Sequence, residues 1–313
     1  MIWSISSDKM FSRCQRQWFY KQVFGNANAR KDEERYEAYL LSKLQSISSL
    51  RGHAVDEAIS EFAVPAFNKQ RSVCKQELLD FANRRFEAKL KFVKEHQFNQ
   101  RLKNPAKLPD NFAMLFDREY GNVVNDEEFD RAFSEIEAAI DNFFTIDQLI
   151  DTLRRSDRIV SQRALMWKVG ANTVRAVPDA IAFYEHEPPV VFDWKVHYFG
   201  NADAGRQLAS YAIALARAKP HRDFPFSADR WPETETRLME AQLLRGEVRE
   251  HQYSDFQFEE LENWIYRKVN EAAAALVGRS RSSDFNPQDF ATAYSGRQCE
   301  VCNFKRLCWR EFS

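Results

Sequence analysis

Apolar and polar residues follow one another with the period of an α-helix over most of the first half of the chain. This periodicity predicts helices over about 6–24, 30–45, 51–63, 70–100 and 126–150. Gly25 is expected to end the first helix, and Pro65 the third. The first half is therefore predicted to be mainly helical.

The pattern changes between residues 158 and 199, where three runs rich in β-branched and aromatic residues are separated by Gly170–Asn172 and by Pro188–Pro189. These runs predict an antiparallel meander. An amphipathic helix over about 203–219 follows, then a strand near 237–244 and a helix near 256–277. The fold class is thus α/β, with a helical region at 1–155, an α/β core at 156–277 and a cysteine-rich segment at 278–313.

Composition narrows the class of protein. The 313 residues hold 45 basic and 46 acidic side chains, a net charge of −1 that excludes a generally basic nucleic-acid coat. Arg84 to Lys107 is nevertheless locally basic, either as a solvated helix face or as a surface for nucleic acid. No apolar run is long enough to span a membrane, and the first twenty residues are too charged for a signal peptide, so we expect a cytoplasmic protein.

An aspartate and a lysine interrupt the apolar strand VVFDWKV. Residues 193 and 195 of a strand point to the same face, so Asp193 and Lys195 are expected side by side. If Asp179 lies on the neighbouring strand, two carboxylates converge within reach of one Mg²⁺ or Mn²⁺ ion, which prefers oxygen ligands. The alternative is a structural ion pair at a strand end.

The helix after this strand carries Gln207 and Tyr211 on one face, four residues apart. These two side chains are in a position to orient a substrate phosphate or Lys195. The other apolar positions of this helix are expected to pack on the sheet.

Together these residues resemble the PD-(D/E)xK nucleases of the RecB type. The family's lone Asp, its D/E-x-K strand and its Q-x-x-x-Y helix correspond to Asp179, to Asp193–Lys195 and to Gln207 with Tyr211. The resemblance implies a restriction-endonuclease-like core, a mixed sheet flanked by helices. It also implies that Asp179, Asp193 and the main-chain carbonyl of Trp194 bind the metal.

One further metal ligand of that family comes from a G-x-x-x-H pattern on an earlier helix. The corresponding run here is GHAVD, which begins at Gly52, so Asp56 stands at the position of the histidine and His53 lies one turn earlier. Asp56 stands at the position of the family's metal ligand, whereas His53 has the imidazole side chain that the family uses there. Both stay candidates.

The five cysteines are an odd number, which makes disulfides a poor first interpretation. Cys299, Cys302 and Cys308 are close enough in sequence to bind one metal or cluster, which needs a fourth ligand, and a family resemblance makes Cys14 the candidate for it. Spacing alone leaves zinc open. The segment around Cys14 resembles that of the iron–sulfur members of the same nuclease family, including the CRISPR-associated RecB-like exonucleases, and this resemblance implies a 4Fe–4S cluster that clasps the two ends. Cys74 is left as a free thiol.

The expected function is a metal-dependent DNA nuclease, exonuclease-like on single strands or DNA ends, in repair, recombination or anti-phage defence. The alternative is a non-catalytic subunit that binds DNA ends or docks onto a helicase. Because the chain has no Walker-type G-x-x-x-x-G-K-[ST] run, a separately encoded helicase or ATPase partner is expected. Tyr20, Tyr198 and Phe199 are candidates for stacking on exposed bases.

Overall fold

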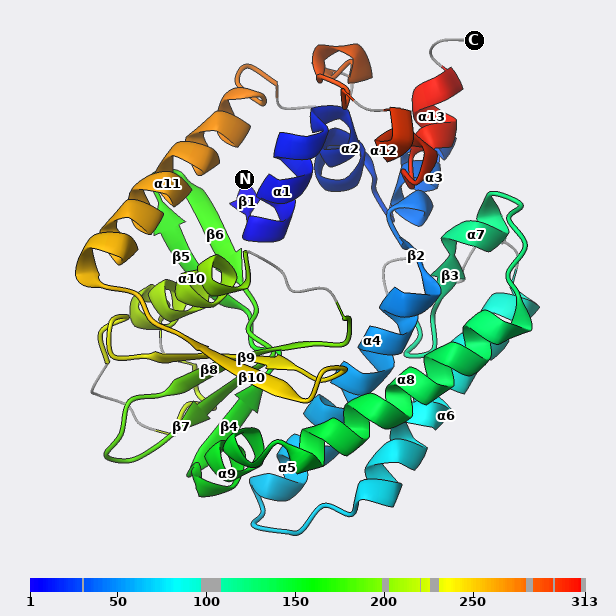
Figure 1. Ribbon diagram of the computed structural model, residues 1–313. Coiled ribbons are helices and arrows are strands. Elements are labelled where there is room, and N and C mark those ends of the chain that lie inside the picture. Colours follow the sequence, from blue (N-terminus) through cyan, green and yellow to red (C-terminus); the bar gives the residue numbers. More distant parts are fainter. Residues whose placement is uncertain are drawn as a thin grey trace.

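A computed structural model describes residues 1–29, 31–96, 108–198, 203–219, 221–225, 231–279, 284–294 and 296–310 (Figure 1). Its centre is a five-stranded sheet in the order β10-β9-β8-β7-β4. The strands are β4 (Arg158–Ser161), β7 (Ala180–Phe183), β8 (Val190–Lys195), β9 (Arg237–Gln242) and β10 (Glu247–His251).

Strands β8 and β9 are parallel, whereas the other neighbours in this sheet are antiparallel. A parallel pair needs a crossover connection, and helix α10 (Ala204–Arg217) lies between β8 and β9 in the chain and contacts both. This crossover carries the helix with Gln207 and Tyr211 back over the sheet.

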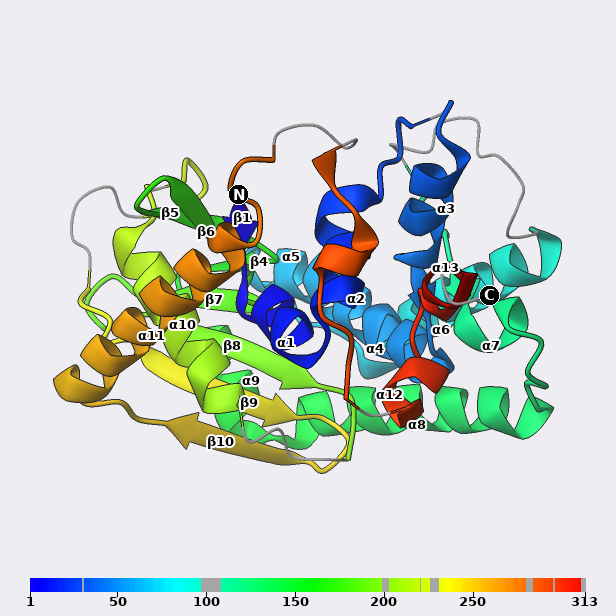
Figure 2. The same cartoon turned by 90° about the horizontal axis from the view of Figure 1, so that it is seen from above.

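Helices cover both faces of the sheet (Figures 1 and 2). On one face Val190, Phe192 and Trp194 pack in a core shared with the first-half helices. On the other face Val191 and Leu238 pack in a core shared with α10 and with α11 (Asp255–Ala274). The first-half helices are α4 (Ile47–Ala58), α5 (Val64–Phe67), α6 (Lys75–Glu95), α8 (Asp126–Thr145) and α9 (Asp147–Arg155). The alternation of side chains along β8 therefore decides which residues face α10.

The predicted meander is wrong in one respect, because its strands divide between two sheets. β5 (Leu165–Val169) and β6 (Asn172–Ala176) form a hairpin that pairs with β1 (Ile2–Trp3) rather than with β4 or β7. Gly170 has the positive φ of 57° that the tight turn requires. A run of alternating residues does not specify its pairing partner, so this division was hidden in the sequence. Strands β2 (Leu44–Gln45) and β3 (Met114–Leu115) form a third, small sheet.

The helix boundaries also differ from the pattern. The first predicted helix breaks at Cys14, whose extended backbone separates α1 (Ile5–Arg13) from α2 (Gln15–Phe19) and a π-helix at Tyr20–Phe24. Pro65 does not end its helix. A π-helix at Ile59–Ala63 leads into α5, where the proline occupies the first turn and its missing N–H is not needed.

The basic helix face turns out to be partly internal. Lys89 is buried, and its Nζ lies 2.7 Å from Glu57 Oε1; Arg85 pairs with Glu57 and Glu61. These two cations are therefore committed to helix packing on α4 and the π-helix that follows it, not to a nucleic acid. The basic residues at 101, 103 and 107 lie outside the described residues. No helix among the described residues is long and apolar enough to cross a membrane.

Two segments from opposite ends of the chain pack together. The ring of Phe19 stacks on Phe290 at 4.4 Å between centroids, and Tyr20 stacks on Phe304 at 5.6 Å. Tyr20 is fully buried in this contact and is not available to stack on a base, whereas Tyr198 is exposed and Phe199 lies outside the described residues. The segment 284–310 also holds α12 (Gly296–Glu300) and α13 (Lys305–Arg310), close to α3 (Glu33–Leu41) (Figure 1).

Candidate active site

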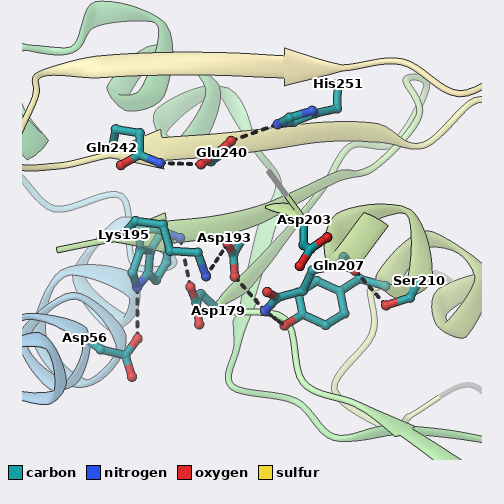
Figure 3. Close-up of polar contacts among 12 residues, drawn as sticks. Asp56, Asp179, Asp193, Lys195, Asp203, Gln207, Ser210, Glu240, Gln242 and His251 are labelled. Carbon is teal, nitrogen blue, oxygen red and sulfur yellow. Dashed lines mark hydrogen bonds and ion pairs between the residues drawn. The ribbon is translucent and has the colours of Figure 1, made fainter. Parts of the chain in front are cut away.

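The two charged side chains of strand β8 lie on one face of the sheet. Asp193 and Lys195 share the face of Val191, toward α10, while Trp194 points to the opposite face. The Lys195 Nζ lies 2.6 Å from Asp193 Oδ2, and the Asp193 side chain is almost completely buried (Figure 3). The expected pairing of Asp193 and Lys195 is therefore present.

Asp179 joins this pair from the neighbouring strand. Ala180 on β7 pairs with Phe192 on β8, which brings Asp179 beside the Asp193–Trp194 peptide. The main-chain N–H of Trp194 donates to Asp179 Oδ2 at 2.8 Å. This antiparallel register holds the Asp179 carboxylate at the end of the sheet where Asp193 and Lys195 lie (Figure 3).

The earlier helix α4 contributes Asp56 and not His53 to the same cluster. The indole Nε1 of Trp194 donates to Asp56 Oδ1 at 2.9 Å, from the face of β8 that packs on α4. His53 is exposed, and its Nδ1 lies 3.3 Å from the amide nitrogen of Gln45. One helical turn thus separates a carboxylate that is bonded into the cluster from an imidazole at its outer edge.

Helix α10 contributes Gln207 and Tyr211 to the cluster, from the face of the sheet that Asp193 occupies. The Gln207 amide donates to Asp193 Oδ1 at 3.1 Å and to the phenol oxygen of Tyr211 at 2.5 Å. The Ser210 hydroxyl donates to the carbonyl of Gln207 at 2.6 Å. Gln207 therefore orients Asp193, and Tyr211 orients Gln207, from the helix face that the sequence predicted (Figure 3).

Gln162 was not expected to belong to the site. Its side-chain amide bridges two carboxylates, Asp56 Oδ1 at 2.8 Å and Asp179 Oδ1 at 3.2 Å. Its φ of 50° lies in the left-handed region, which costs a non-glycine residue about 1–2 kcal/mol. The backbone conformation gives no signal in the sequence, because any polar residue after a strand reads as the start of a loop.

A second polar group missed by sequence analysis lies on β9 and β10. Glu240 pairs in register with Asp193 and is buried; His251 Nε2 lies 2.9 Å from its Oε2, and Gln242 donates to its other oxygen (Figure 3). Gly205 allows the approach, because a Cβ there would lie 2.8 Å from His251 Nδ1. Strand β10 is too polar to stand out in the sequence, so its histidine was not placed near the site.

The electrostatics of the cluster favour a cation. Burial, together with Asp193 and Asp56, raises the pKa of Asp179 well above its ordinary value. Burial also raises the pKa of Asp193, against the opposing effect of Lys195, and the pKa of Asp56. Three carboxylates face a single ammonium, an excess of two negative charges that a divalent ion with oxygen ligands would neutralise.

This donor set fits Mg²⁺ or Mn²⁺ by charge and by ligand type. In the geometry of the described residues, no three His, Cys, Asp or Glu side chains form a ready metal-binding group. The amide of Gln162 and the N–H groups of Trp194 instead occupy carboxylate oxygens of Asp56 and Asp179. These bonds fix the positions of the two carboxylates.

The four cysteines of the predicted clasp lie in one neighbourhood. Burial, together with the nearby thiols of Cys14, Cys308 and Cys299, raises the pKa of the Cys302 thiol to about 11. The main-chain N–H of Gln17 donates to Cys14 Sγ at 3.4 Å. None of the five cysteines forms a disulfide, and Cys74 is exposed directly before α6.

Comparison with known proteins assigns the family. The model of the PD-(D/E)XK nuclease superfamily matches residues 2–309, so the chain belongs to this superfamily. Its members are nucleases, and the mixed sheet flanked by helices agrees with the restriction-endonuclease-like core that the sequence predicted. Membership indicates a metal-dependent enzyme that acts on nucleic acid.

No curated protein matches the chain. A solved structure titled "Crystal structure of SSO0001" is 16% identical, with a TM-score of 0.28, and the alignment covers 60% of this chain and 79% of that one.

Proposed function

We propose that this chain is a Mg²⁺- or Mn²⁺-dependent deoxyribonuclease of the RecB type, exonuclease-like on single-stranded DNA or DNA ends. The observation that carries the proposal is the contact of Lys195 with Asp193 beside Asp179, inside a chain of the nuclease superfamily. A buried Asp–Lys pair is costly to keep for stability alone, which supports a chemical role.

Asp179, Asp193 and the main-chain carbonyl of Trp194 would hold the divalent ion, and Asp56 would complete the carboxylate set. The ion supplies Lewis-acid stabilisation of the phosphate and lowers the pKa of water. Lys195 donates toward the developing negative charge or orients the attacking water through its Nζ. Gln207 and Tyr211 keep Asp193 in one rotamer, which preserves the geometry that hydrolysis needs.

The test is cleavage of end-labelled linear DNA, single-stranded and duplex, with Mg²⁺ or Mn²⁺. We expect Lys195→Ala to lower the rate at least 100-fold while circular dichroism shows that the protein stays folded at the assay temperature. Circular single-stranded DNA should resist cleavage if the enzyme needs an end. Binding of DNA ends without cleavage by the wild type would instead favour the non-catalytic subunit.

We further propose that Cys14, Cys299, Cys302 and Cys308 hold a 4Fe–4S cluster that ties the two ends of the chain together. The support is that the thiols of Cys14, Cys299 and Cys308 each lie near enough to Cys302 to raise its pKa, together with their order in the sequence. An anaerobic preparation should be brown and contain iron and sulfide. Cys302→Ser should lose both, and Cys74→Ser, the matched control, should keep them. A colourless zinc protein would overturn this assignment.

Cell context is part of the same proposal. A cytoplasmic nuclease of this kind without its own ATPase motif fits repair, recombination or anti-phage defence beside a separately encoded helicase. Affinity purification from native cells should then recover an ATPase together with the chain. Recovery of the chain without any ATPase would contradict the partner.

A further inference from the structure

A pocket of about 230 Å³ adjoins the candidate active site on the α10 side of the sheet. Gln207 and Tyr211 form the wall that the pocket shares with the Asp193 cluster. The opposite walls come from β1, the first turn of α1, and the β5–β6 hairpin, with Trp3, Ser4, Lys9 and Arg175 among the lining residues. Neither the predicted metal ligands nor the cysteines take part in it.

The charged side chains that line this pocket are all cations. Its two charged lining residues, Lys9 and Arg175, are cations, and none of its lining residues is an aspartate or a glutamate. Lys9 pairs with Asp203 at 3.2 Å, just outside the lining. Arg175 is exposed on β6, and its guanidinium forms no ion pair or hydrogen bond with any residue in the part of the chain that the structure describes. One full positive charge is therefore left without a partner.

A buried donor in the wall of the pocket is also unused. Trp3 is 1% exposed, and its indole Nε1 has no hydrogen-bond partner among the described residues. An indole N–H can only donate, and a buried donor without an acceptor costs about 1–3 kcal/mol. Trp3 thus brings a donor without an acceptor to the wall of the pocket.

The first turn of α1 adds to the same polarity. Ser4 caps this nine-residue helix, and Ser4, Ile5 and Ser6 line the pocket. The Ser4 hydroxyl already accepts from the Ser7 N–H, but the helix dipole still places partial positive charge at this end. An unpaired guanidinium, an unused indole N–H and a helix N-terminus all select an anion.

We propose that this pocket is a phosphate-binding subsite for the nucleic-acid strand that the enzyme cleaves, with Arg175 as its main cation and Trp3 Nε1 as a buried donor. The proposal rests on the proposed nuclease function. Because Gln207 belongs both to the pocket and to the Asp193 cluster, the bound phosphate would lie beside the scissile one. The phosphate is either internal to the strand or at its end, and the two sources are separable by experiment.

The test is binding of a fluorescent single-stranded oligonucleotide to the full chain, with a chelator present so that no cleavage occurs, between about 50 and 200 mM salt. Arg175→Ala should weaken binding about tenfold at low salt. It should also reduce the slope of log K against log salt by about 0.7, the value for one phosphate contact on a single strand. Trp3→Phe should weaken binding with an unchanged slope, since it removes no charge.

Arg158→Ala is the matched control, because Arg158 is an exposed strand arginine without a partner among the described residues, on β4. It should leave both the affinity and the slope unchanged. If Arg175→Ala behaves like Arg158→Ala, the subsite does not exist. If the effect of Arg175→Ala requires a 5′- or 3′-phosphate, the subsite holds the end of the strand; an equal effect with hydroxyl ends indicates an internal phosphate.

These outcomes separate the subsite from the nuclease. Loss of cleavage in Lys195→Ala together with unchanged binding in Arg175→Ala would refute the subsite and keep the nuclease. Absence of metal-dependent cleavage in the wild type together with weaker binding in Arg175→Ala would refute the nuclease and keep the phosphate site.

Discussion

Replacing Asp179 by asparagine should change the pH dependence of stability in the metal-free protein. The pKa of Asp179 is raised in the folded state, first by burial and then by Asp193 and Asp56. A group with a raised folded pKa contributes its full stability only below its unfolded pKa, near 4. That stability is lost as the pH rises through the raised pKa. The metal-free wild type is therefore expected to become less stable as the pH rises above about 4.

The size of this pH effect follows from the linkage between proton binding and unfolding. One titrating group changes the free energy of unfolding by at most about 1.4 kcal/mol per pH unit. For 313 residues the unfolding entropy is about 0.66 kcal/mol/K, so this slope equals about 2 °C per pH unit. Asp179→Asn should flatten the fall in melting temperature by up to this amount. The slope is the better readout, because the loss of a hydrogen bond from Gln162 would change the melting temperature by the same amount at every pH.

Metal binding supplies the second half of the test. At a concentration one hundred times its dissociation constant, a divalent ion stabilises the folded state by about 2.7 kcal/mol, or about 4 °C in this chain. Thermal melts with chelator and with Mg²⁺ should show this shift in the wild type and in the control Asp151→Asn, an exposed site on α9. Asp179→Asn should not show it. An unchanged pH slope and an unchanged metal shift in Asp179→Asn would refute the reasoning.

Two further predictions concern neighbouring carboxylates. Asp56→Asn should lower the cleavage rate by about 10- to 100-fold, while His53→Ala should change it little, because only Asp56 is bonded into the cluster. The measurement is the initial rate of cleavage of labelled DNA. Equal losses in the two variants would contradict the assignment of Asp56, and not His53, to the site. Glu57→Ala leaves the buried Lys89 ammonium without its carboxylate, which costs about 3 kcal/mol and lowers the melting temperature by about 5 °C. The exposed Glu87→Ala serves as control, and a loss no greater than that of the control would show that Lys89 finds another partner.

The sequence predicted the centre of the site better than its surroundings. Asp193, Lys195, Gln207 and Tyr211 lie as expected because strand alternation and helical periodicity are local rules. Asp179 also joins them, since it directly precedes the strand that pairs with theirs. Such placements need only the correct element type and one short connection.

What the sequence did not predict depends on pairing between distant segments. The β5–β6 hairpin pairs with Ile2–Trp3, more than 160 residues earlier in the chain, and no local pattern encodes that partner. Gln162 contacts two carboxylates because its backbone is left-handed. His251 contacts Glu240 from β10, a strand that was not predicted. These features follow from tertiary packing, which overrides propensity.

The contact between Phe19 and Phe290 has a consequence for how the chain folds during synthesis. The Arg16 guanidinium donates to the Phe290 carbonyl across 274 residues, so the aromatic surface around Phe19 stays uncovered until that much chain has been made. At 5–20 residues per second the wait is about 15–55 s. The nascent helices near Phe19 thus lack their aromatic partner Phe290 for longer than most small domains need to fold.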